Sequence, residues 1–301
     1  MDAYLNALEK EMTQCKEWLA GKQMVSVYVG GGTPTSLSEE QFERLMAMTE
    51  KYLPMEQSKE FTVEAGRPDS ITEGKLRSMK THGVTRISIN PQSMKEHTLE
   101  LLGRKHTVEE IREKFMLART LGFDNINMDL IAGLPEETLE DFKETLREVE
   151  ALKPDSITVH TLVIKRASRL RKEQLEQGGE MREEDACIEP MQKEAEQFCR
   201  VHGYEPYYMY RQKNKAHTTR NTNQENVAYA KPGKECLYNI FIMEELQSIL
   251  ALGAGASTKF VMNDRIERAE NVKDIKNYIE RIDEMIERKK QGYCDYEKNR
   301  V

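Results

Sequence analysis

Polar side chains and one run of glycines follow apolar stretches that have the length of β-strands. The run is Gly30–Thr33, after Val25–Val29; the side chains are Glu64, Asn90 with Gln92, Asp129 and His160. Glycine lets a ligand reach main-chain N–H and C=O groups, and a buried carboxylate costs free energy unless it is paired or ligand-bound. One such residue is ordinary helix capping. Four at equivalent positions of successive units favour a ligand site at the mouth of an α/β cylinder.

Other residues that could do chemistry are an arginine, two histidines and the cysteines. Arg104, in LLGRKHT, carries a guanidinium suited to bidentate carboxylate binding. His106 and His160 have no second ligand at a suitable spacing, so we interpret them as orienting or core histidines rather than metal ligands. The sequence has 5 cysteines, no two within ten residues of each other, which indicates free thiols in a reducing compartment.

The elements that must position these residues alternate between strand and helix. Strands are expected at Val25–Val29, Phe61–Ala65, Arg86–Asn90, Asn125–Ile131 and Ser156–Val163. Helices are expected at Asp2–Leu19, after Ser38, at Thr72–His82, after Thr107 and at Glu137–Leu152. Ser38 with Gln41 and Thr107 with Glu110 have the capping-box spacing. The alternation predicts a parallel sheet with right-handed crossovers. It fits a barrel or part of one better than a flat doubly wound sheet, although spacing alone leaves both open.

After Lys165 the pattern changes, which predicts a second region. The expected division is 1–165, 166–292 and a tail at 293–301. Asp185–His202 has a helical pattern, Tyr204–Arg211 is extended, and Lys213–Asn226 is a polar loop. Apolar residues from Val272 to Ile286 recur at steps of three and four, which predicts one amphipathic helix.

Composition bounds the class of protein. The 301 residues are 38% hydrophobic and 32% charged, with a net charge of −7. The negative sign argues against general nucleic-acid binding, which requires a basic face. No apolar run approaches the roughly 18 residues that a membrane span needs, and the acidic first residues are unlike a signal peptide. We therefore expect a cytoplasmic protein with a small-molecule partner and no nucleic acid or membrane.

Several motifs occur together in the order found in one enzyme family. They read GGGTPT, TVEAGRPDS, GVTRISINPQSM, LLGRKHT and NINMDLIAGLPEET. The chain resembles the radical S-adenosylmethionine (SAM) enzymes of the oxygen-independent coproporphyrinogen III oxidase type. AGRPD, VHTLVIKRASRL, KPGKECLYN and LGAGAS are most similar to the HemZ branch. The resemblance implies a partial (β/α)6 barrel, followed by a smaller α+β C-terminal region.

The same resemblance implies an activity and its cofactors. Family members bind SAM and a [4Fe–4S] cluster, and a radical derived from SAM drives decarboxylation of coproporphyrinogen III to protoporphyrinogen IX in haem biosynthesis. The implied SAM contacts are Gly31, Gly32, Thr33, Glu64, Gln92, Arg104 and Asp129. Within that set, Arg104 would bind the methionine carboxylate and Asp129 the ribose hydroxyls. An electron donor and a tetrapyrrole are the implied partners.

A basic segment follows the last expected strand. Lys165, Arg166 and Arg169 could bind the four carboxylates of such a substrate. A solvated charged face explains the same residues, and this alternative stays open.

The chain departs from the family in one respect. Relatives carry the cluster on a CxxxCxxC loop after the first barrel strand, upstream of GGGTPT, and this sequence contains neither. We therefore expect no metal ligands and no activity from this chain alone. A truncated reading frame, a cluster-less SAM- or haem-binding paralogue, and cysteines from a separate polypeptide all stay open. A missing first strand would also leave Val25–Val29 as a sheet edge, which predicts self-association.

Overall fold

The computed structural model describes residues 1–161, 188–211 and 225–299, which form two compact units. Unit 1 comprises Met1–Val63, Glu73–Val84 and Cys236–Val301, and unit 2 comprises Glu64–Thr72 and Thr85–Glu235. The units are interleaved along the chain, whereas the sequence analysis divides it once, after residue 165. That division stays a prediction, because its boundary lies outside the described residues.

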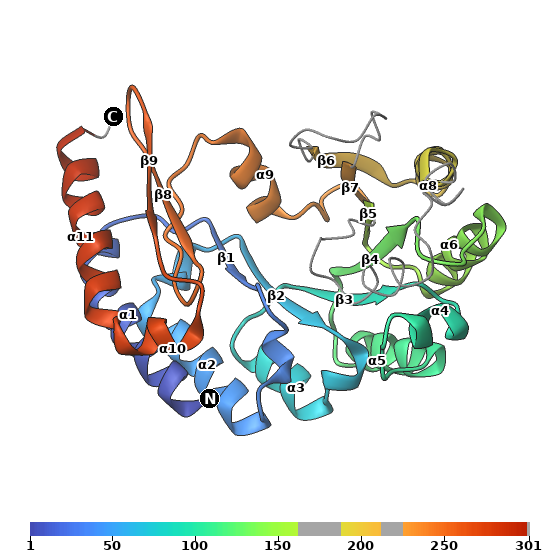
Figure 1. The fold of residues 1–301 in the computed structure, drawn as a ribbon, viewed down its shortest axis with the longest axis horizontal. Coiled ribbons are helices and arrows are strands. Elements are labelled where there is room, and N and C mark those ends of the chain that lie inside the picture. The colour runs from blue at the N-terminus through green and yellow to red at the C-terminus, as the bar shows by residue number, and fades with distance from the viewer. Residues whose placement is uncertain (162–187, 212–224, 300–301) are drawn as a thin grey trace, which may run out of the picture. The chain divides into compact units, whose positions relative to one another are not determined.

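Unit 1 combines long helices with short strands. Its elements are α1 (Asp2–Leu19), β1 (Ser26–Val29), η1 (Pro34–Ser36), α2 (Glu39–Tyr52), η2 (Met55–Gln57), the first half of β2 (Glu60–Gly66), α3 (Glu73–Thr81), α9 (Leu237–Glu244), β8 (Ser257–Val261), β9 (Ile266–Glu270), α10 (Ile275–Glu280) and α11 (Ile282–Asn299). Strands β1 and β2 pair in parallel, and β8 and β9 form an antiparallel hairpin. Helix α1 packs against α2, α10 and α11, and α11 also packs along the hairpin (Figure 1).

The core of unit 1 encloses an ion pair. Glu11 on α1 and Lys289 on α11 are both fully buried and bonded to each other. The Tyr278 hydroxyl and the Gly253 N–H donate to Glu11 at 2.7 and 2.8 Å. Asn271 donates to Glu11 at 2.8 Å and accepts from Lys289 at 2.9 Å. Because buried charges are tolerated only when paired and hydrogen-bonded, this network fixes α1 against the C-terminal helices.

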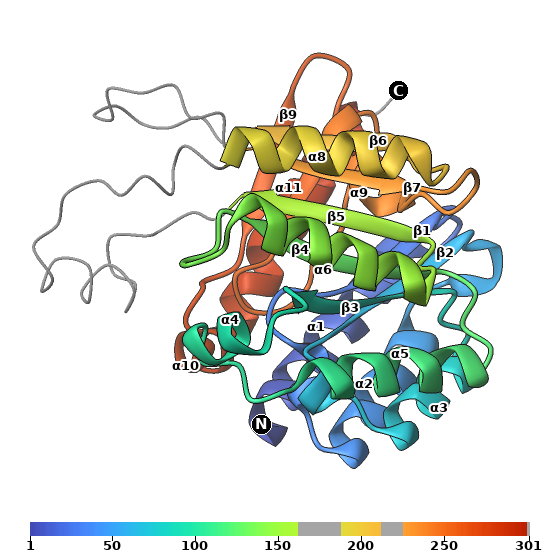
Figure 2. The same ribbon diagram turned by 90° about the vertical axis from the view of Figure 1, so that its right-hand side faces the viewer.

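Unit 2 contains the larger sheet. Its elements are the second half of β2, η3 (Pro68–Ser70), β3 (Arg86–Gln92), α4 (Glu96–Leu101), α5 (Val108–Thr120), β4 (Ile126–Ala132), α6 (Leu139–Leu152), β5 (Ser156–Thr161), α8 (Ile188–Val201), β6 (Glu205–Arg211) and β7 (Glu225–Ala230). Strands β3, β4 and β5 are parallel, β7 is antiparallel to β5, and β6 pairs with β7. Helix α5 packs on β3, and α6 and α8 lie side by side (Figure 2).

The structure confirms most of the predicted elements. The capping boxes at Ser38 and Thr107 are both formed, and each of the five expected strands is present. The helix expected to start at Glu137 begins two residues later, because Thr138 caps it through a third capping box with Asp141.

The C-terminal expectations were wrong in two places. The single amphipathic helix predicted from Val272 to Ile286 is instead two helices, which meet at Arg281. The apolar spacing runs through the break because Tyr278 and Ile282 pack in the same core cluster. The residues expected as a tail are helical through Asn299, since their tyrosines pack on the cluster around Phe260. Among the described helices, none is long and apolar enough to cross a bilayer.

Candidate functional site

Polar side chains of β4 and β5 form a connected cluster in unit 2, and His160 lies near the carboxyl end of β5. Asn127 and Asp129 are two residues apart on β4 and so point to the same face. Asn127 donates to Asp129 at 2.6 Å and accepts from Ser156 and Thr158 at 3.0 Å each. His160 on β5 places Nε2 3.8 Å from Asp129 Oδ2. The Asp129 carboxylate is therefore oriented by two groups, the Asn127 amide at one oxygen and the His160 imidazole at the other.

Charge stabilises this pair in its ionised form. Burial would raise the pKa of Asp129, but the contacts with His160 and Asn127 outweigh it and hold that pKa below its usual range. Burial would likewise lower the pKa of His160, but Asp129, Asn226 and the charge of Glu64 raise it. Both side chains keep some exposure, 35% for His160 and 19% for Asp129. The pair thus presents an anionic acceptor to solvent or to a ligand.

Two further predicted residues lie on β2 and β3. Glu64 lies in the second half of β2, close enough for its charge to act on His160. Gln92 is the last residue of β3 and is half-buried. The β3–β4 register shifts between Ile89 and Gln92, and Gln92 has a φ of +70°, in the left-handed region that non-glycine residues rarely adopt. The chain therefore makes a strained turn where the sequence predicts a ligand contact.

Arg104 belongs to a second cluster in unit 2. Arg67 donates to both oxygens of Asp69, at 3.0 and 2.5 Å. His106 is buried with Nδ1 3.7 Å from Asp69, and neither ring nitrogen has a hydrogen-bond partner among the described residues. Burial, and then the charge of Arg104, lower the pKa of His106. Burial also lowers the pKa of Arg104, and the charge of Arg67 adds to this effect. The Arg104 guanidinium is partly buried and forms no ion pair within the described part of the chain, which suits it to an anionic ligand.

The glycine run lies in unit 1, after β1. Gly31 has a φ of +104°, and a Cβ added at Gly31 or Gly32 would meet no atom within 4 Å. Gly30–Thr33 line a cavity of about 1000 Å³ within unit 1. Strand β1, helix α1 and helix α9 also line it. A side chain at Gly31 or Gly32 would therefore project into unfilled space rather than into neighbouring atoms.

The predicted site residues thus lie in three separate places in the described structure. Glu64 and Asp129 gather around His160, Arg104 lies in the cluster with Arg67, and the glycine run belongs to the other unit. The basic residues Lys165, Arg166 and Arg169 lie outside the described residues. The sequence analysis missed Asn127, whose signal was its position two residues before Asp129 on the same strand. It also missed Asn226, which comes from distant β7 and left no local signal.

Comparison with known proteins identifies the family. A model of the radical SAM superfamily matches residues 3–149. The heme chaperone HemW of Bacillus subtilis is 33% identical over 94% of this chain and 69% of its own length. The chain belongs to the radical SAM superfamily. Within that superfamily it is of the HemZ type, since the oxygen-independent coproporphyrinogen-III oxidase-like protein HemZ of B. subtilis is 44% identical over 95% of this chain.

The fold agrees with this family. A solved structure of the radical SAM enzyme coproporphyrinogen III oxidase (HemN) from Escherichia coli matches with a TM-score of 0.72 at 24% identity. The match covers 95% of this chain. The predicted radical SAM α/β fold is therefore confirmed. The chain spans 57% of the length of HemZ and 63% of the HemN chain.

The radical SAM family uses SAM and a [4Fe–4S] cluster, and the two fit this chain differently. Such clusters are held by cysteine thiolates. Burial raises the pKa values of Cys15 and Cys199 to about 12, which disfavours their thiolates. In the described part of the chain, no group of three or more potential ligands could hold a metal. Within unit 2, the cation Arg104 and the anionic acceptor Asp129 have the chemistry that SAM requires, but the described residues do not fit the cluster.

Proposed function

We propose that this chain is the SAM-binding part of a porphyrin-biosynthesis oxidoreductase. The observation that carries the proposal is Arg104, a partly buried guanidinium with no ion pair to any other described residue. The methionine end of SAM carries a carboxylate, the partner that a guanidinium binds most strongly. Asp129 supports the same assignment, because its lowered pKa keeps it an acceptor for the ribose hydroxyls.

The remaining proposed SAM contacts are assigned from the family motifs in which these residues stand. The proposed SAM-binding residues are Gly31, Gly32, Thr33, Glu64, Gln92, Arg104 and Asp129. Backbone carbonyl groups of the glycine run would accept from the methionine amino group. SAM, when bound beside a cluster, supplies the hydrogen-abstracting chemistry of the family; the residues of this chain bind and orient it.

We propose coproporphyrinogen III as the substrate and its oxidative decarboxylation to protoporphyrinogen IX as the reaction. Lys165, Arg166 and Arg169 are the proposed partners of the substrate carboxylates. The reaction needs the CxxxCxxC cysteines of the family, which a longer form of this protein would carry. The 301-residue chain by itself is inactive on this proposal, because its sequence contains no such motif.

A non-catalytic SAM- or haem-binding protein is the second candidate. The 33% identity to a protein named heme chaperone favours it. Titration with hemin, followed by Soret absorbance, separates the two candidates. Tight hemin binding without any SAM binding supports the second.

Isothermal titration with S-adenosylhomocysteine, which has the carboxylate and ribose of SAM, tests the first proposal. Arg104→Ala should weaken binding about 10- to 100-fold, the effect of losing a hydrogen bond between charged groups. Asp129→Asn should weaken it to a smaller extent. The matched control is Arg147→Ala, since that side chain is 60% exposed and pairs only on the surface of α6. Absence of wild-type binding at ~1 mM ligand would refute the proposal.

A further inference from the structure

Four described residues other than glycine have a positive φ, and two of them need explaining. Lys153 and Glu245 end helices α6 and α9, where a left-handed residue is common. Gln92 (φ 70°) ends strand β3, and Glu136 (φ 62°) lies in the loop between β4 and α6. Neither terminates a helix. Strained backbone of this kind costs free energy and persists only where the surrounding structure enforces it.

A buried hydrogen bond joins the residues that immediately follow these two. The Ser93 hydroxyl donates to Glu137 Oε1, and Ser93 is 1% and Glu137 7% exposed. Ser93 Oγ accepts in turn from the Lys95 N–H at 3.2 Å. One hydrogen bond therefore connects the residues next to the two strained positions, of which one ends β3 and the other lies in the loop after β4.

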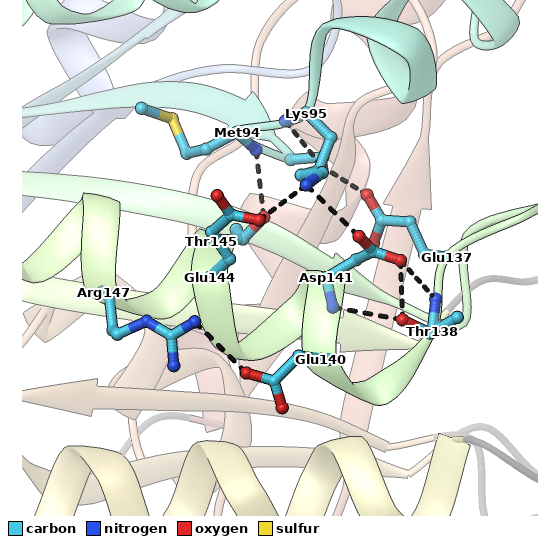
Figure 3. A network of polar contacts seen from close by, with 10 residues as sticks. Met94, Lys95, Glu137, Thr138, Glu140, Asp141, Glu144, Thr145 and Arg147 are labelled. Atoms are coloured by element: carbon cyan, nitrogen blue, oxygen red, sulfur yellow. Dashed lines mark hydrogen bonds and ion pairs between the residues drawn. The ribbon is translucent and has the colours of Figure 1, made fainter.

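Helix α6 anchors both sides of this connection. The Met94 N–H donates to the Thr145 hydroxyl at 3.2 Å, and Lys95 Nζ reaches Glu144 and Asp141 at 2.6 and 3.2 Å (Figure 3). Thr138, next to Glu137, forms the capping box with Asp141 that starts the helix. The segment after Gln92 is thus held to the first turns of α6 by contacts of Met94 and Lys95, the two residues that follow Ser93.

We propose that the Ser93–Glu137 hydrogen bond is a clasp that sets the conformation of Gln92 for SAM binding, so that Glu137 is a positioning residue. The inference rests on the proposed function, because it takes Gln92 as a SAM contact. Without the clasp, Gln92 is free to relax to negative φ, and its side chain turns away from the direction that the strained backbone imposes. In Glu137→Gln the side-chain carboxamide oxygen can still accept the hydrogen bond from Ser93, whereas the methyl side chain of Glu137→Ala cannot.

The test compares binding of S-adenosylhomocysteine by the wild type with that by Ser93→Ala, Glu137→Ala, their double variant and Glu137→Gln. Each alanine variant should bind about tenfold more weakly, the double variant no more weakly than either, and Glu137→Gln should restore binding to within about twofold. Amide exchange at Lys95 should accelerate in the alanine variants and recover in Glu137→Gln. The control Glu140→Ala, an exposed neighbour paired only with residues of α6, should change neither readout.

The outcomes separate this inference from the proposed function. If the wild type binds no S-adenosylhomocysteine, the proposed function fails and the inference fails with it. If the wild type binds and the alanine variants bind equally well, the proposed function stands and the clasp is refuted. A double variant with twice the logarithmic loss of the single variants would also refute it, because the two residues would then act independently. Ser93→Ala and Glu137→Gln, both isosteric or nearly so, keep the test valid if Glu137→Ala does not fold.

Discussion

The buried pair of Glu11 and Lys289 supports a quantitative prediction about stability. Both side chains are 0% exposed, and Glu11 accepts four hydrogen bonds. Glu11→Gln preserves the size of the side chain but removes the charge that compensates Lys289. Loss of one partner of a buried pair costs about 3–5 kcal/mol. Because domains are stable by only about 5–15 kcal/mol, the variant should lose a large part of its free energy of unfolding.

The structure provides a matched control between the same two helices. Lys10 and Asp283 also join α1 to α11, at 2.6 Å, but their side chains are 49% and 79% exposed. Asp283→Asn should therefore cost less than about 1 kcal/mol. Urea unfolding of the two variants and the wild type, followed by circular dichroism, measures the difference.

Two outcomes would contradict this reasoning. If Glu11→Gln costs no more than Asp283→Asn, burial of the pair does not have the energetic consequence assigned to it. The double variant Glu11→Gln/Lys289→Met carries no buried charge, so it should be more stable than Glu11→Gln alone. A double variant that is less stable would show that packing around Lys289, rather than its charge, dominates.

Three further predictions concern single groups. Burial would lower the pKa of His82, but hydrogen bonds with Glu43 and Glu50 raise it. His82 therefore stabilises the fold below about pH 6.5, and this stabilisation is lost as pH rises through the higher folded pKa. His82→Asn should reduce the free energy of unfolding at pH 6 more than at pH 9, and an equal loss at both would contradict the assignment. Cys294 is exposed and should react at once with a thiol reagent, whereas Cys15, whose pKa burial raises to about 12, should react only on unfolding. Cys294→Ser should reduce the fast phase by one thiol per chain, and an unchanged fast phase would contradict the assignment. Anaerobic incubation of the 301-residue chain with iron and sulfide should give no stable [4Fe–4S] absorbance after desalting, and a persistent brown species would overturn our conclusion on the cluster.

Local signals in the sequence predicted the elements well. Ser38 and Thr107 cap their helices as expected, because a capping box involves residues only three apart. The strands that contain Glu64 and Asp129 were predictable for a similar reason, since each is a short apolar run that the sequence shows directly. The break at Arg281 was not predictable, because the apolar spacing that reports a helix continues across it.

The partners of the site residues were beyond local patterns. Asn226 contacts His160 from a strand that follows a long charged and polar region. Glu137 was assigned to a helix from its spacing, although it precedes the N-cap and bonds to Ser93 across the sheet. Such contacts depend on tertiary packing, which brings together residues with no fixed separation in sequence.

The antiparallel return of β7 along β5 has a consequence for how the protein is made. Strand β7 pairs with Ser156–Val159, and Asn226 at its start accepts from the Thr161 N–H at 3.4 Å. During translation, β5 leaves the ribosome more than sixty residues of synthesis before this neighbour leaves it. At a typical 5–20 residues per second, the β5 edge waits several seconds for its cover. Nascent chains stalled within that interval should recruit holding chaperones, and chains stalled after Ala230 has emerged should release them.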